Sequence, residues 1–535
     1  MRNPSKINVL STVTKGLAID WGTEWVKMVL VAPTVQGSLR PAVEVVVDEQ
    51  SERRTPALVA FDPPPAATGR LLVGNAAGRV AGRRPDAVLP ALKRLLGGSL
   101  DPSAAATSAR SYARDFAHHF TPPRALSTDE SRRGAAVVEE PLAGRRVRVE
   151  EAVARLFEHC RDLAGGPDEV AEVVVTVPPY YTFAQRRLLA QTLRLAGLEP
   201  LVLVNDLTAA AIDYASTRQF PSRERTVFFD VGAHAASASV VEFRTVDGQT
   251  HIKVLGTDSE LDVGGFAWDG RLAGHLAQVF GRDPSSLPPR ALSKLLKEAQ
   301  LAKEELSNAP TAEVDIENLY EGRDLVTVVT HEQLEGLIAD LLPRAAAVIG
   351  RALAQAGVAL SDVSAIELFG GAARGDEAAV LGAATQLILT KDWGRLISPS
   401  FPRLVVNDLP PPSGAGGVEV GELDGEALEE VQRGLEEFAT REREYQETAN
   451  WRNTLEASIL ERKSQLEESE DLQPEEVREE IVELLRSAEE WLEDLPENAR
   501  AEEVRQKFTE LQERLAELTA QTTTNQDQRP RRDEL

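Results

Sequence analysis

The chain has 535 residues, which is too long for one hydrophobic core and predicts two to four domains. Its net charge of −26 offers no positive field to a phosphate backbone, which argues against nucleic acid as a partner. The single cysteine, Cys160, excludes an internal disulfide and a cysteine-based zinc site. No apolar run reaches the length of a membrane span, so we expect no membrane partner.

The first element in chain order is an apolar hairpin. Strand-like residues 17–19 and 25–31 flank a short turn that contains Asp20 and Gly22. Glycine in a turn lets backbone N–H groups approach a phosphate, and a carboxylate beside it suits hydrated Mg²⁺. By itself the pattern is more typical of an ordinary hairpin, because a single Asp-x-Gly is weak evidence for a site.

Helices and strands then alternate along the chain. This alternation predicts an α/β fold, in which polar turns at the sheet ends bind ligands. Residues 97–142 are rich in Ala, Ser, Pro and charge, which predicts a poorly ordered insertion. The predicted elements are helix 87–96, helix 149–163, strand 170–177, helix 183–196, strand 201–204 and helix 209–214.

A second hairpin of the same kind follows at residues 226–243, with Asp230 and Gly232 in its turn. Two such hairpins that face each other would clamp the phosphates of one nucleotide from both sides. Asp20 and Asp230 would then share the water shell of one metal ion. This duplication is far more specific than either motif alone.

A third element is the strand 365–369, which ends in Gly370 and Gly371. Two glycines give a flat backbone turn that can lie against an adenosine, and Arg374 would cover the ring face. A plain tight turn explains the two glycines equally well.

The order of these motifs resembles the seventy-kilodalton heat shock chaperone superfamily. The resemblance covers residues 17–391 and is closest to the large endoplasmic-reticulum branch, the hypoxia up-regulated proteins. It implies an α/β actin-like ATPase fold, in which two ribonuclease-H-like lobes surround a nucleotide cleft. Besides the hairpins and Gly-Gly-Ala-Ala-Arg, it rests on Thr-Val-Pro-Pro-Tyr-Tyr (176–181), Asn-Asp-Leu-Thr-Ala-Ala-Ala (205–211), Val-Gly-Gly (263–265) and Ile-Glu-Asn-Leu-Tyr-Glu-Gly (316–322).

By similarity, ATP or ADP with Mg²⁺ would bind between the lobes. Asp20, Asp206 and Asp230 would serve catalysis, and Asp20 and Asp230 would hold the metal through water. Four of the implied contacts share one helix face, at spacings i, i+3, i+4 and i+7, although a solvated face would be the ordinary explanation. The implied nucleotide contacts are Gly22, Thr23, Glu24, Trp25, Gly232, Ala233, His234, Gly264, Gly265, Gln300, Lys303, Glu304, Ser307, Gly370, Gly371, Ala372, Arg374 and Asp376.

Departures from the family pattern bear on hydrolysis. Gly78 occupies the place of the family's catalytic lysine, so no cation would position the attacking water there. Ala233 and His234 stand where ordinary members have glycines, and Asp206 is one methylene shorter than the usual glutamate. Together these changes predict nucleotide binding with slow or absent hydrolysis. His234 could equally be a neutral turn residue that touches nothing.

The second half of the chain predicts a different architecture. We expect a nucleotide-binding domain at 1–391 and a linker at 392–425, in which the family's β-sandwich substrate domain is largely missing. Apolar positions at helical spacing then predict a lid-like α-helical bundle at 426–521, followed by a disordered tail at 522–535. The resemblance also implies that a helix and a strand of the second lobe are missing after Arg374, because Gly375 follows it directly.

The last four residues, Arg-Asp-Glu-Leu at 532–535, resemble the retrieval signal of endoplasmic-reticulum proteins. We therefore expect the lumen of that compartment, although no signal peptide is visible after Met1. Without such a peptide the expected location would be the cytoplasm.

Several functions are compatible with these features. The resemblance implies a stress-response chaperone or co-chaperone that binds ATP, holds unfolded polypeptides and acts as a nucleotide exchange factor for a luminal seventy-kilodalton chaperone. The alternative is a small-molecule (sugar) kinase of the actin-like fold. That kinase would need a catalytic base and a sugar pocket, and the helical bundle would have no evident task. A filament-forming actin relative is disfavoured by that bundle and by the linker, and a degenerate scaffold that binds nothing is the last alternative.

Overall fold

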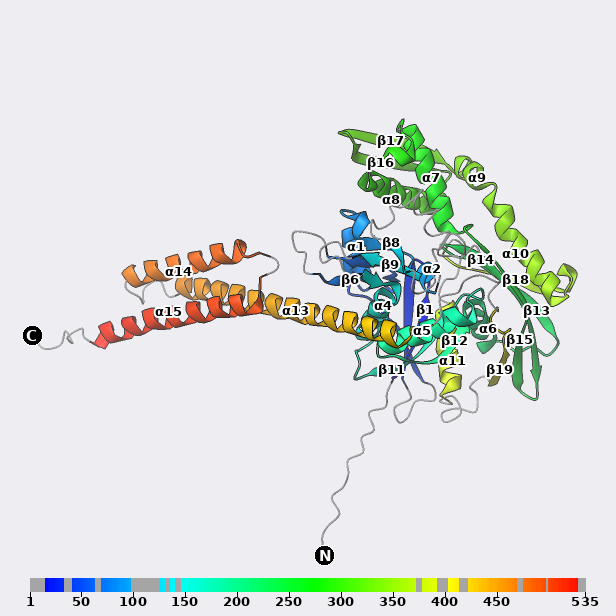
Figure 1. Ribbon diagram of the computed structural model, residues 1–535, viewed down its shortest axis with the longest axis horizontal. Helices are drawn as coiled ribbons and strands as arrows, with labels where there is room; N and C mark the ends of the chain where they lie inside the picture. The colour runs from blue at the N-terminus through cyan, green and yellow to red at the C-terminus, as the bar shows by residue number, and fades with distance from the viewer. Residues whose placement is uncertain are drawn as a thin grey trace, which may run out of the picture. The chain divides into compact units, whose positions relative to one another are not determined.

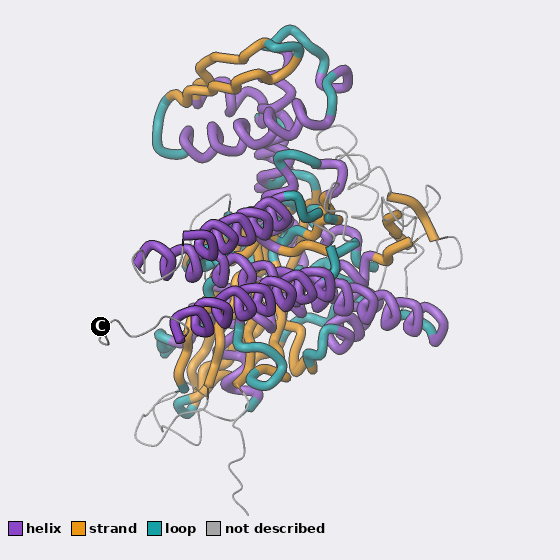
Figure 2. The backbone as a smooth tube through the Cα atoms, turned by 90° about the vertical axis from the view of Figure 1, so that its left-hand side faces the viewer, coloured by secondary structure: helices purple, strands orange, loops and turns teal. Residues whose placement is uncertain are grey.

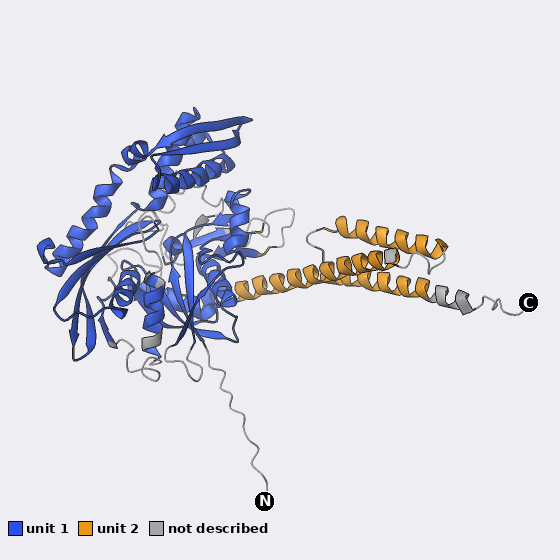
Figure 3. Cartoon of the chain, turned by 180° about the vertical axis from the view of Figure 1, so that it is seen from behind, with its two compact units in different colours: residues 1–61, 71–432 blue, residues 62–70, 433–535 orange. Residues whose placement is uncertain are grey.

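The computed structural model divides the chain into two compact units (Figure 3). Unit 1 comprises residues 1–61 and 71–432, and unit 2 comprises residues 62–70 and 433–535. Unit 1 combines mixed sheets with helices, and the C-terminal region is helical, which confirms the fold class expected from the sequence. The structure describes residues 15–32, 41–62, 69–97, 126–129, 135–139, 146–371, 378–391, 403–412, 422–468, 475–496 and 499–527.

The first sheet of unit 1 is built around the first hairpin. Its strand order is β12-β11-β1-β2-β3, and β4 also pairs with β2. The parallel neighbour β11 runs beside β1, while β2 returns antiparallel, so Asp20 lies opposite Lys27. The strands are β1 (Lys15–Trp21), β2 (Trp25–Ala32), β3 (Ala42–Val46), β4 (Thr55–Pro56), β11 (Val170–Val177) and β12 (Glu199–Asn205).

The second sheet repeats this plan around the second hairpin. Its order is β18-β13-β14-β15-β19, with β18 parallel to β13. Residues 403–407, which we expected to be linker, instead form β19 and pair parallel with β15 because their apolar side chains complete that sheet. The strands are β13 (Glu224–Val231), β14 (Ala235–Val246), β15 (Gln249–Leu261), β18 (Ala365–Phe369) and β19 (Arg403–Asn407).

Two helices, α6 (Asp206–Ser216) and α11 (Ala378–Thr390), pack together between the sheets (Figure 1). One apolar core includes residues of both sheets and both helices, for example Ala18, Phe228, Ile212 and Leu387. Burial of this shared core fixes the ends of the two central hairpins relative to each other. The outer helices of the first sheet are α4 (Val149–Leu163) and α5 (Phe183–Leu195), close to the bounds expected from the sequence.

Two smaller subdomains extend from the sheets. One carries α7 (Gly265–Val279), α8 (Pro289–Leu306) and α9 (His331–Ile338) with the hairpin β16 (Thr311–Tyr320) and β17 (Arg323–Thr330), and Figure 2 shows that hairpin lying on helices. It joins the second sheet, whose strands β14 and β15 are covered by α10 (Leu341–Ala356). The other carries β5 (Val59–Phe61), β6 (Leu71–Val73), α1 (Gly74–Ala81), β7 (Val88–Leu89) and α2 (Leu92–Leu95).

Two local predictions in the first half were wrong. Residues 87–96 do not form one helix, because Pro90 interrupts the segment and Ala91 takes a left-handed conformation (φ 51°) before the short α2. Within the expected disordered insertion, β8 (Leu126–Asp129) and β9 (Ala135–Glu139) form a sheet with β10 (Arg146–Arg148). Most other residues of that insertion lie outside the described part of the chain.

Unit 2 is helical, with α13 (Gly425–Glu468, in this unit from Arg433), α14 (Glu475–Glu493) and α15 (Ala501–Asp527). A buried cluster that includes Leu455, Leu485 and Leu511 holds the three helices together. The last helix continues to Asp527, so the helical region ends six residues later than the expected end at 521.

The Arg-Asp-Glu-Leu tail lies outside the described residues. No helix in the described part of the chain is both long and apolar enough to cross a membrane.

Candidate functional site

A cavity of about 260 Å³ in unit 1 collects most of the predicted site residues. Gly264 does not line it but supports its wall, since a Cβ at that position would lie 2.2 Å from the Gly232 carbonyl oxygen. Ala372, Arg374 and Asp376 lie outside the described residues. The predicted residues that line the cavity are Asp20, Gly22, Thr23, Glu24, Trp25, Asp206, Asp230, Gly232, Ala233, His234, Gly265, Gln300, Lys303, Glu304, Ser307, Gly370 and Gly371.

The two hairpin turns have the same backbone hydrogen bond. The Gly22 N–H donates to the Trp25 carbonyl oxygen at 2.9 Å, and the Gly232 N–H donates to the Ala235 carbonyl oxygen at 3.0 Å. Each turn therefore follows its aspartate by the same two residues and presents that aspartate to the cavity. The predicted duplication is thus a duplication of geometry as well as of sequence.

Three carboxylates crowd one end of the cavity. The Thr176 hydroxyl donates to Asp20 Oδ1 at 2.6 Å, and Lys27 Nζ lies 3.9 Å from Asp20 Oδ2. Asp206 begins α6, where burial raises the pKa of its carboxyl to about 6. Burial, and then the charges of Asp206 and Asp20, raise the pKa of Asp230 to about 7.

This crowding fits a hydrated divalent cation better than a directly coordinated one. Excess negative charge in a buried place is relieved by a cation. Among the described residues, however, no three His, Cys, Asp or Glu side chains lie close enough together to hold a metal ion themselves. Water-mediated contact from Asp20 and Asp230, as expected from the sequence, is compatible with both observations.

Another part of the cavity wall is formed by the face of α8. Gln300 Nε2 donates to Glu24 Oε1 at 2.8 Å, which ties α8 to the first hairpin turn. Lys303 Nζ lies 2.7 Å from Asp269 Oδ1. Burial raises the pKa of Glu24, and it raises the pKa of Asp269 to about 6 although Lys303 acts against it. All four residues of the α8 face therefore line the cavity, with Gln300 and Lys303 partly buried and Glu304 and Ser307 exposed to solvent.

The turn after β18 comes close to the second aspartate. Gly370 has φ +96°, and a Cβ there would lie 2.4 Å from Asp230 Oδ1 and from the Val231 carbonyl oxygen. Only glycine adopts this conformation without strain at so close an approach. The two glycines are thus more than a plain tight turn, because the first lets the chain reach the carboxylate.

His234 is buried in the cavity wall and does make a contact. Its Nδ1 lies 3.3 Å from Asp262 Oδ1, and its Nε2 has no partner among the described residues. Burial, and then the charges of Arg94 and Lys93, hold the pKa of His234 well below its usual value, so the ring is neutral at pH 7. The interpretation of His234 as a turn residue that touches nothing was wrong.

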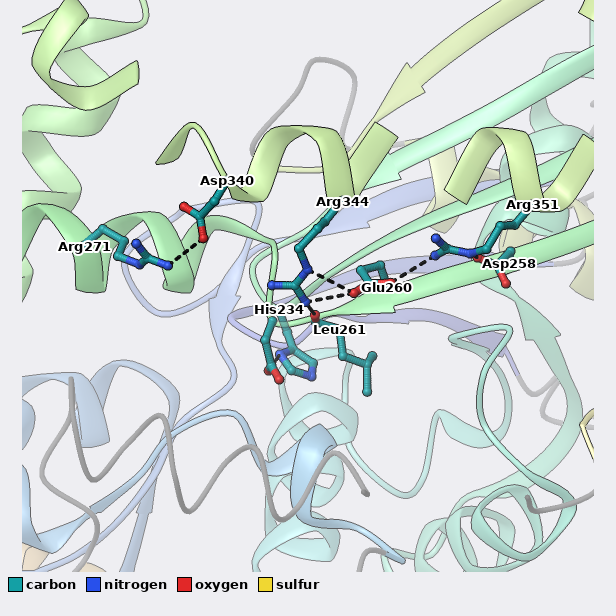
Figure 4. Close-up of polar contacts among 9 residues, drawn as sticks. His234, Asp258, Glu260, Leu261, Arg271, Asp340, Arg344 and Arg351 are labelled. Atoms are coloured by element: carbon teal, nitrogen blue, oxygen red, sulfur yellow. Dashed lines mark hydrogen bonds and ion pairs between the residues drawn. The ribbon is translucent and has the colours of Figure 1, made fainter. Parts of the chain in front are cut away.

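The position of Asp262 depends on α10. Arg344 Nη2 donates to Glu260 Oε1 at 2.8 Å, and Arg351 Nε donates to Asp258 Oδ2 at 2.6 Å. Figure 4 shows both arginines reaching the end of β15, close to His234. These ion pairs are exposed and individually weak, but together they fix the strand from which Asp262 leads into the cavity wall.

Sequence reasoning missed two cations at this site. Lys93 lines the cavity, and Arg94 Nη2 donates to Asp262 Oδ1 at 3.2 Å. Both side chains are buried, on the short helix α2. The available signal was their position among Leu92, Leu95 and Leu96, since a charge inside an apolar run requires a partner.

The comparisons with known proteins agree with this geometry. The family model for the Hsp70 protein matches residues 19–377. The chain belongs to the Hsp70 family. It is 30% identical over 373 residues to hypoxia up-regulated protein 1 of Danio rerio and 32% identical over 386 residues to that of Xenopus laevis. The matches include 67% and 68% of this chain but only 36% and 56% of those relatives, so this Hsp70 chain spans less than two thirds of their length.

This membership confirms two expectations from the sequence. The resemblance to the branch of hypoxia up-regulated proteins was correct, and so was the actin-like ATPase fold. Members of the Hsp70 family bind nucleotide with Mg²⁺, and the cavity lies where both hairpins of the fold meet.

Proposed function

We propose that this Hsp70 chain is an ATP-binding chaperone or co-chaperone whose nucleotide lies in the cavity between the two hairpin turns. The observation that supports it is that Asp20, Asp230 and the α8 face, which are far apart in sequence, line one cavity. The phosphates would meet the turns, and the adenosine would meet Gln300, Lys303, Glu304 and Ser307. We propose that the nucleotide-binding domain comprises the expected residues 1–391 together with β19, which completes its second sheet.

Magnesium, when bound with the nucleotide, would neutralise phosphate charge near the three carboxylates. The protein's own contribution is to orient the site. Thr176 fixes the direction of Asp20 by its hydrogen bond, and the Gly370 backbone packs against Asp230. Nucleotide binding would therefore meet carboxylates that are already in place, which reduces the entropy cost of binding.

Hydrolysis is proposed to be weak because of Gly78. This residue of α1 lines a neighbouring cavity of about 440 Å³ that shares Thr23 and Glu24 with the first. A Cβ added at Gly78 meets nothing within 4 Å, so a side chain can begin there without a clash. The cavity between the hairpin turns already has a cation, Lys93, and Gly78 does not line that cavity. If the glycine at position 78 nevertheless limits hydrolysis, Gly78→Lys should raise ATP turnover by tenfold or more, because it adds a second cation near Thr23 and Glu24. Gly82→Lys, which adds the same charge at the exposed end of α1, should change nothing.

We also propose that the chain acts chiefly as a nucleotide exchange factor for a luminal seventy-kilodalton chaperone. Only residues 408–424 separate β19 from α13, which is far less than the roughly 100 residues that a β-sandwich requires. Any holding of unfolded polypeptides would then need the helical unit or a partner. The terminal Arg-Asp-Glu-Leu supports residence in the endoplasmic-reticulum lumen.

Titration calorimetry of the full chain with ATP and ADP in Mg²⁺ tests the binding proposal. Asp20→Ala should weaken the binding of both nucleotides at least tenfold, while Asp315→Ala on the exposed face of β16 should leave their binding unchanged. Absence of nucleotide binding by the unaltered chain would refute the proposal.

The exchange role is tested with a second protein. The chain should speed release of labelled ADP from a luminal seventy-kilodalton chaperone. No acceleration at stoichiometric amounts rules that role out.

A further inference from the structure

Strand β18 lies at the edge of the second sheet, and no strand pairs with its outer edge in the part of the chain that the structure describes. The first sheet is different at the equivalent place, because β11 is followed there by a further parallel strand, β12. We propose that β18 binds an extended segment of another polypeptide, which joins the second sheet as β12 joins the first. This inference goes beyond nucleotide binding and gives unit 1 a place of its own for an unfolded polypeptide.

The elements that follow β18 do not fill the place beside it. Residues 178–198 connect β11 to β12 and contain the crossover helix α5, whereas only residues 370–377 connect β18 to α11. A crossover to a neighbouring parallel strand needs about a dozen residues or more, so the segment after β18 is too short to provide one. The next strand, β19, pairs with β15 at the opposite edge of the sheet. Among the described elements none is left for β18, so an added strand comes from another polypeptide.

The open edge leaves apolar side chains in contact with water. Ile366 and Leu368 are 46% and 54% exposed, whereas residues 173–177 of β11 are all buried. In the register with β13, Ile366 and Leu368 lie opposite Val227 and Phe229, so the four side chains share one face of the sheet. Val227 is part of a buried core, and Phe229 packs against it. A strand added beside β18 would extend that core and remove Ile366 and Leu368 from water.

The backbone of β18 is suited to pairing. An edge strand presents a row of N–H and C=O groups that a further extended chain satisfies. Natural edge strands are commonly protected by proline or lysine, and residues 365–369, Ala-Ile-Glu-Leu-Phe, contain neither. The strand is held in place from its other side, since all five residues pair with β13. Main-chain hydrogen bonds would therefore give affinity for many sequences, while side chains at alternate positions would give preference.

Glu367, in the middle of β18, determines which segments fit best. It points to the opposite face from Ile366 and Leu368 and is partly buried. Among the described residues no lysine or arginine forms an ion pair with it. Opposite charges on neighbouring strands stabilise a sheet, and like charges destabilise it. The segment that fits best therefore has apolar residues at alternate positions, with a lysine or arginine between them.

A second copy of this chain fits the edge less well. Two copies of β18 related by a two-fold axis would pair antiparallel. The register that pairs Ile366 with Leu368 of the second copy places Glu367 directly opposite Glu367, and two carboxylates at that distance repel each other. The net charge of −26 on each copy adds to the repulsion. The occupant that these charges favour is a basic and apolar segment of another protein.

Fluorescence anisotropy of the full chain with a labelled short peptide of alternating valine and lysine tests the proposal. The unaltered chain should bind this peptide, and Ile366→Ser and Leu368→Ser should each weaken binding by about tenfold, because less apolar surface is buried. Val326→Ser, which changes an exposed valine of β17 in a different sheet, should leave binding unchanged. The same peptide with methylated backbone nitrogens should bind at least about tenfold more weakly, because it cannot donate hydrogen bonds to β18.

Reversal of one charge separates this site from a general attraction to an acidic protein. Glu367→Lys should weaken binding of the valine–lysine peptide about fivefold and strengthen binding of a valine–glutamate peptide by a similar factor. Glu313→Lys makes the same change of charge on the exposed face of β16 and should alter neither. A variant that gains affinity for the second peptide is folded, so its loss of affinity for the first is a property of the site.

Three results would each overturn the proposal. The unaltered chain does not bind the valine–lysine peptide, the two serine variants bind it as well as the unaltered chain does, or the methylated peptide binds equally well. A dimer in sedimentation velocity that Ile366→Ser dissolves would assign the edge to a second copy and would also overturn it. None of these measurements uses nucleotide, so a failure here and a failure of the proposed nucleotide function are observed separately.

Discussion

The two hairpins share a backbone but not their surroundings. In both, an aspartate is the next-to-last residue of the first strand, and a glycine two residues later closes the turn. The parallel neighbour of β1 contributes the Thr176 hydroxyl, which donates to Asp20. The parallel neighbour of β13 contributes no side-chain donor but a glycine backbone, at Gly370, in close contact with Asp230.

This difference shows that a repeated motif can hold two chemically different carboxylates. Asp20 is satisfied by a hydroxyl and a nearby lysine. Asp230 is half-buried beside two other carboxylates, and loss of solvent together with their charges raises its pKa to about 7. The first hairpin therefore carries a stable anion, and the second carries a group that gains from a cation or a proton.

The largest expected effect concerns the glycine beside the second hairpin. Gly370→Ala would place a Cβ 2.4 Å from Asp230 Oδ1 at a φ of +96°. We therefore expect the free energy of unfolding to fall by about 2–4 kcal/mol and nucleotide binding to weaken. Gly371→Ala is the matched control, because a Cβ there meets nothing within 4 Å. Urea unfolding of both variants measures the difference. Equal stability of the two would show that the β18 turn does not press on Asp230.

The second effect compares the turn glycines directly. A Cβ at Gly22 would lie 2.5 Å from the Trp25 carbonyl oxygen, whereas at Gly232 its nearest neighbour would lie 3.5 Å away. Gly22→Ala should therefore cost about 1–3 kcal/mol more than Gly232→Ala in the free energy of unfolding. Thermal melts of the two variants provide the measurement. A larger loss of stability in Gly232→Ala than in Gly22→Ala would contradict this prediction and would mean that the second turn has less room for a side chain.

Sequence patterns predicted the hairpins and the α8 face because these features are local. An Asp-x-Gly turn and residues at i, i+3, i+4 and i+7 can be recognised within one segment. Lys93 gave only a weak local signal, a charge inside an apolar run, and Asp262 gave none, since their partners come from other segments of the chain. We expected residues 403–407 to be linker because they resemble the linker of the family, although Leu404, Val405 and Val406 favour the strand that pairs with β15.

A smaller effect depends on pH. The pKa of Asp230 is raised by burial above its unfolded value of 3.8, so the folded state binds its proton more tightly. Its contribution to stability is thus full below about pH 4 and is lost as pH rises through about 7. Asp230→Asn should remove about 1–3 kcal/mol of this pH dependence in the nucleotide-free protein. Urea unfolding at pH 5 and pH 8 measures it, and parallel pH profiles would contradict the assignment.

The smallest effect involves the residue before the end of each turn. Glu24 of the first turn reaches across to Gln300 of α8, while His234, its counterpart, stays beside Asp262 next to its own sheet. Gln300→Ala should lower stability by only about 0.5–1.5 kcal/mol, because one partly buried hydrogen bond is lost. It should also speed ADP release, since this bond links the two walls of the cavity. Glu305→Ala, an exposed change on the same helix, is the control. Stopped-flow measurement of labelled ADP release compares the two variants. Equal release rates in Gln300→Ala and Glu305→Ala would show that the contact from the first turn to α8 does not hold the cavity closed.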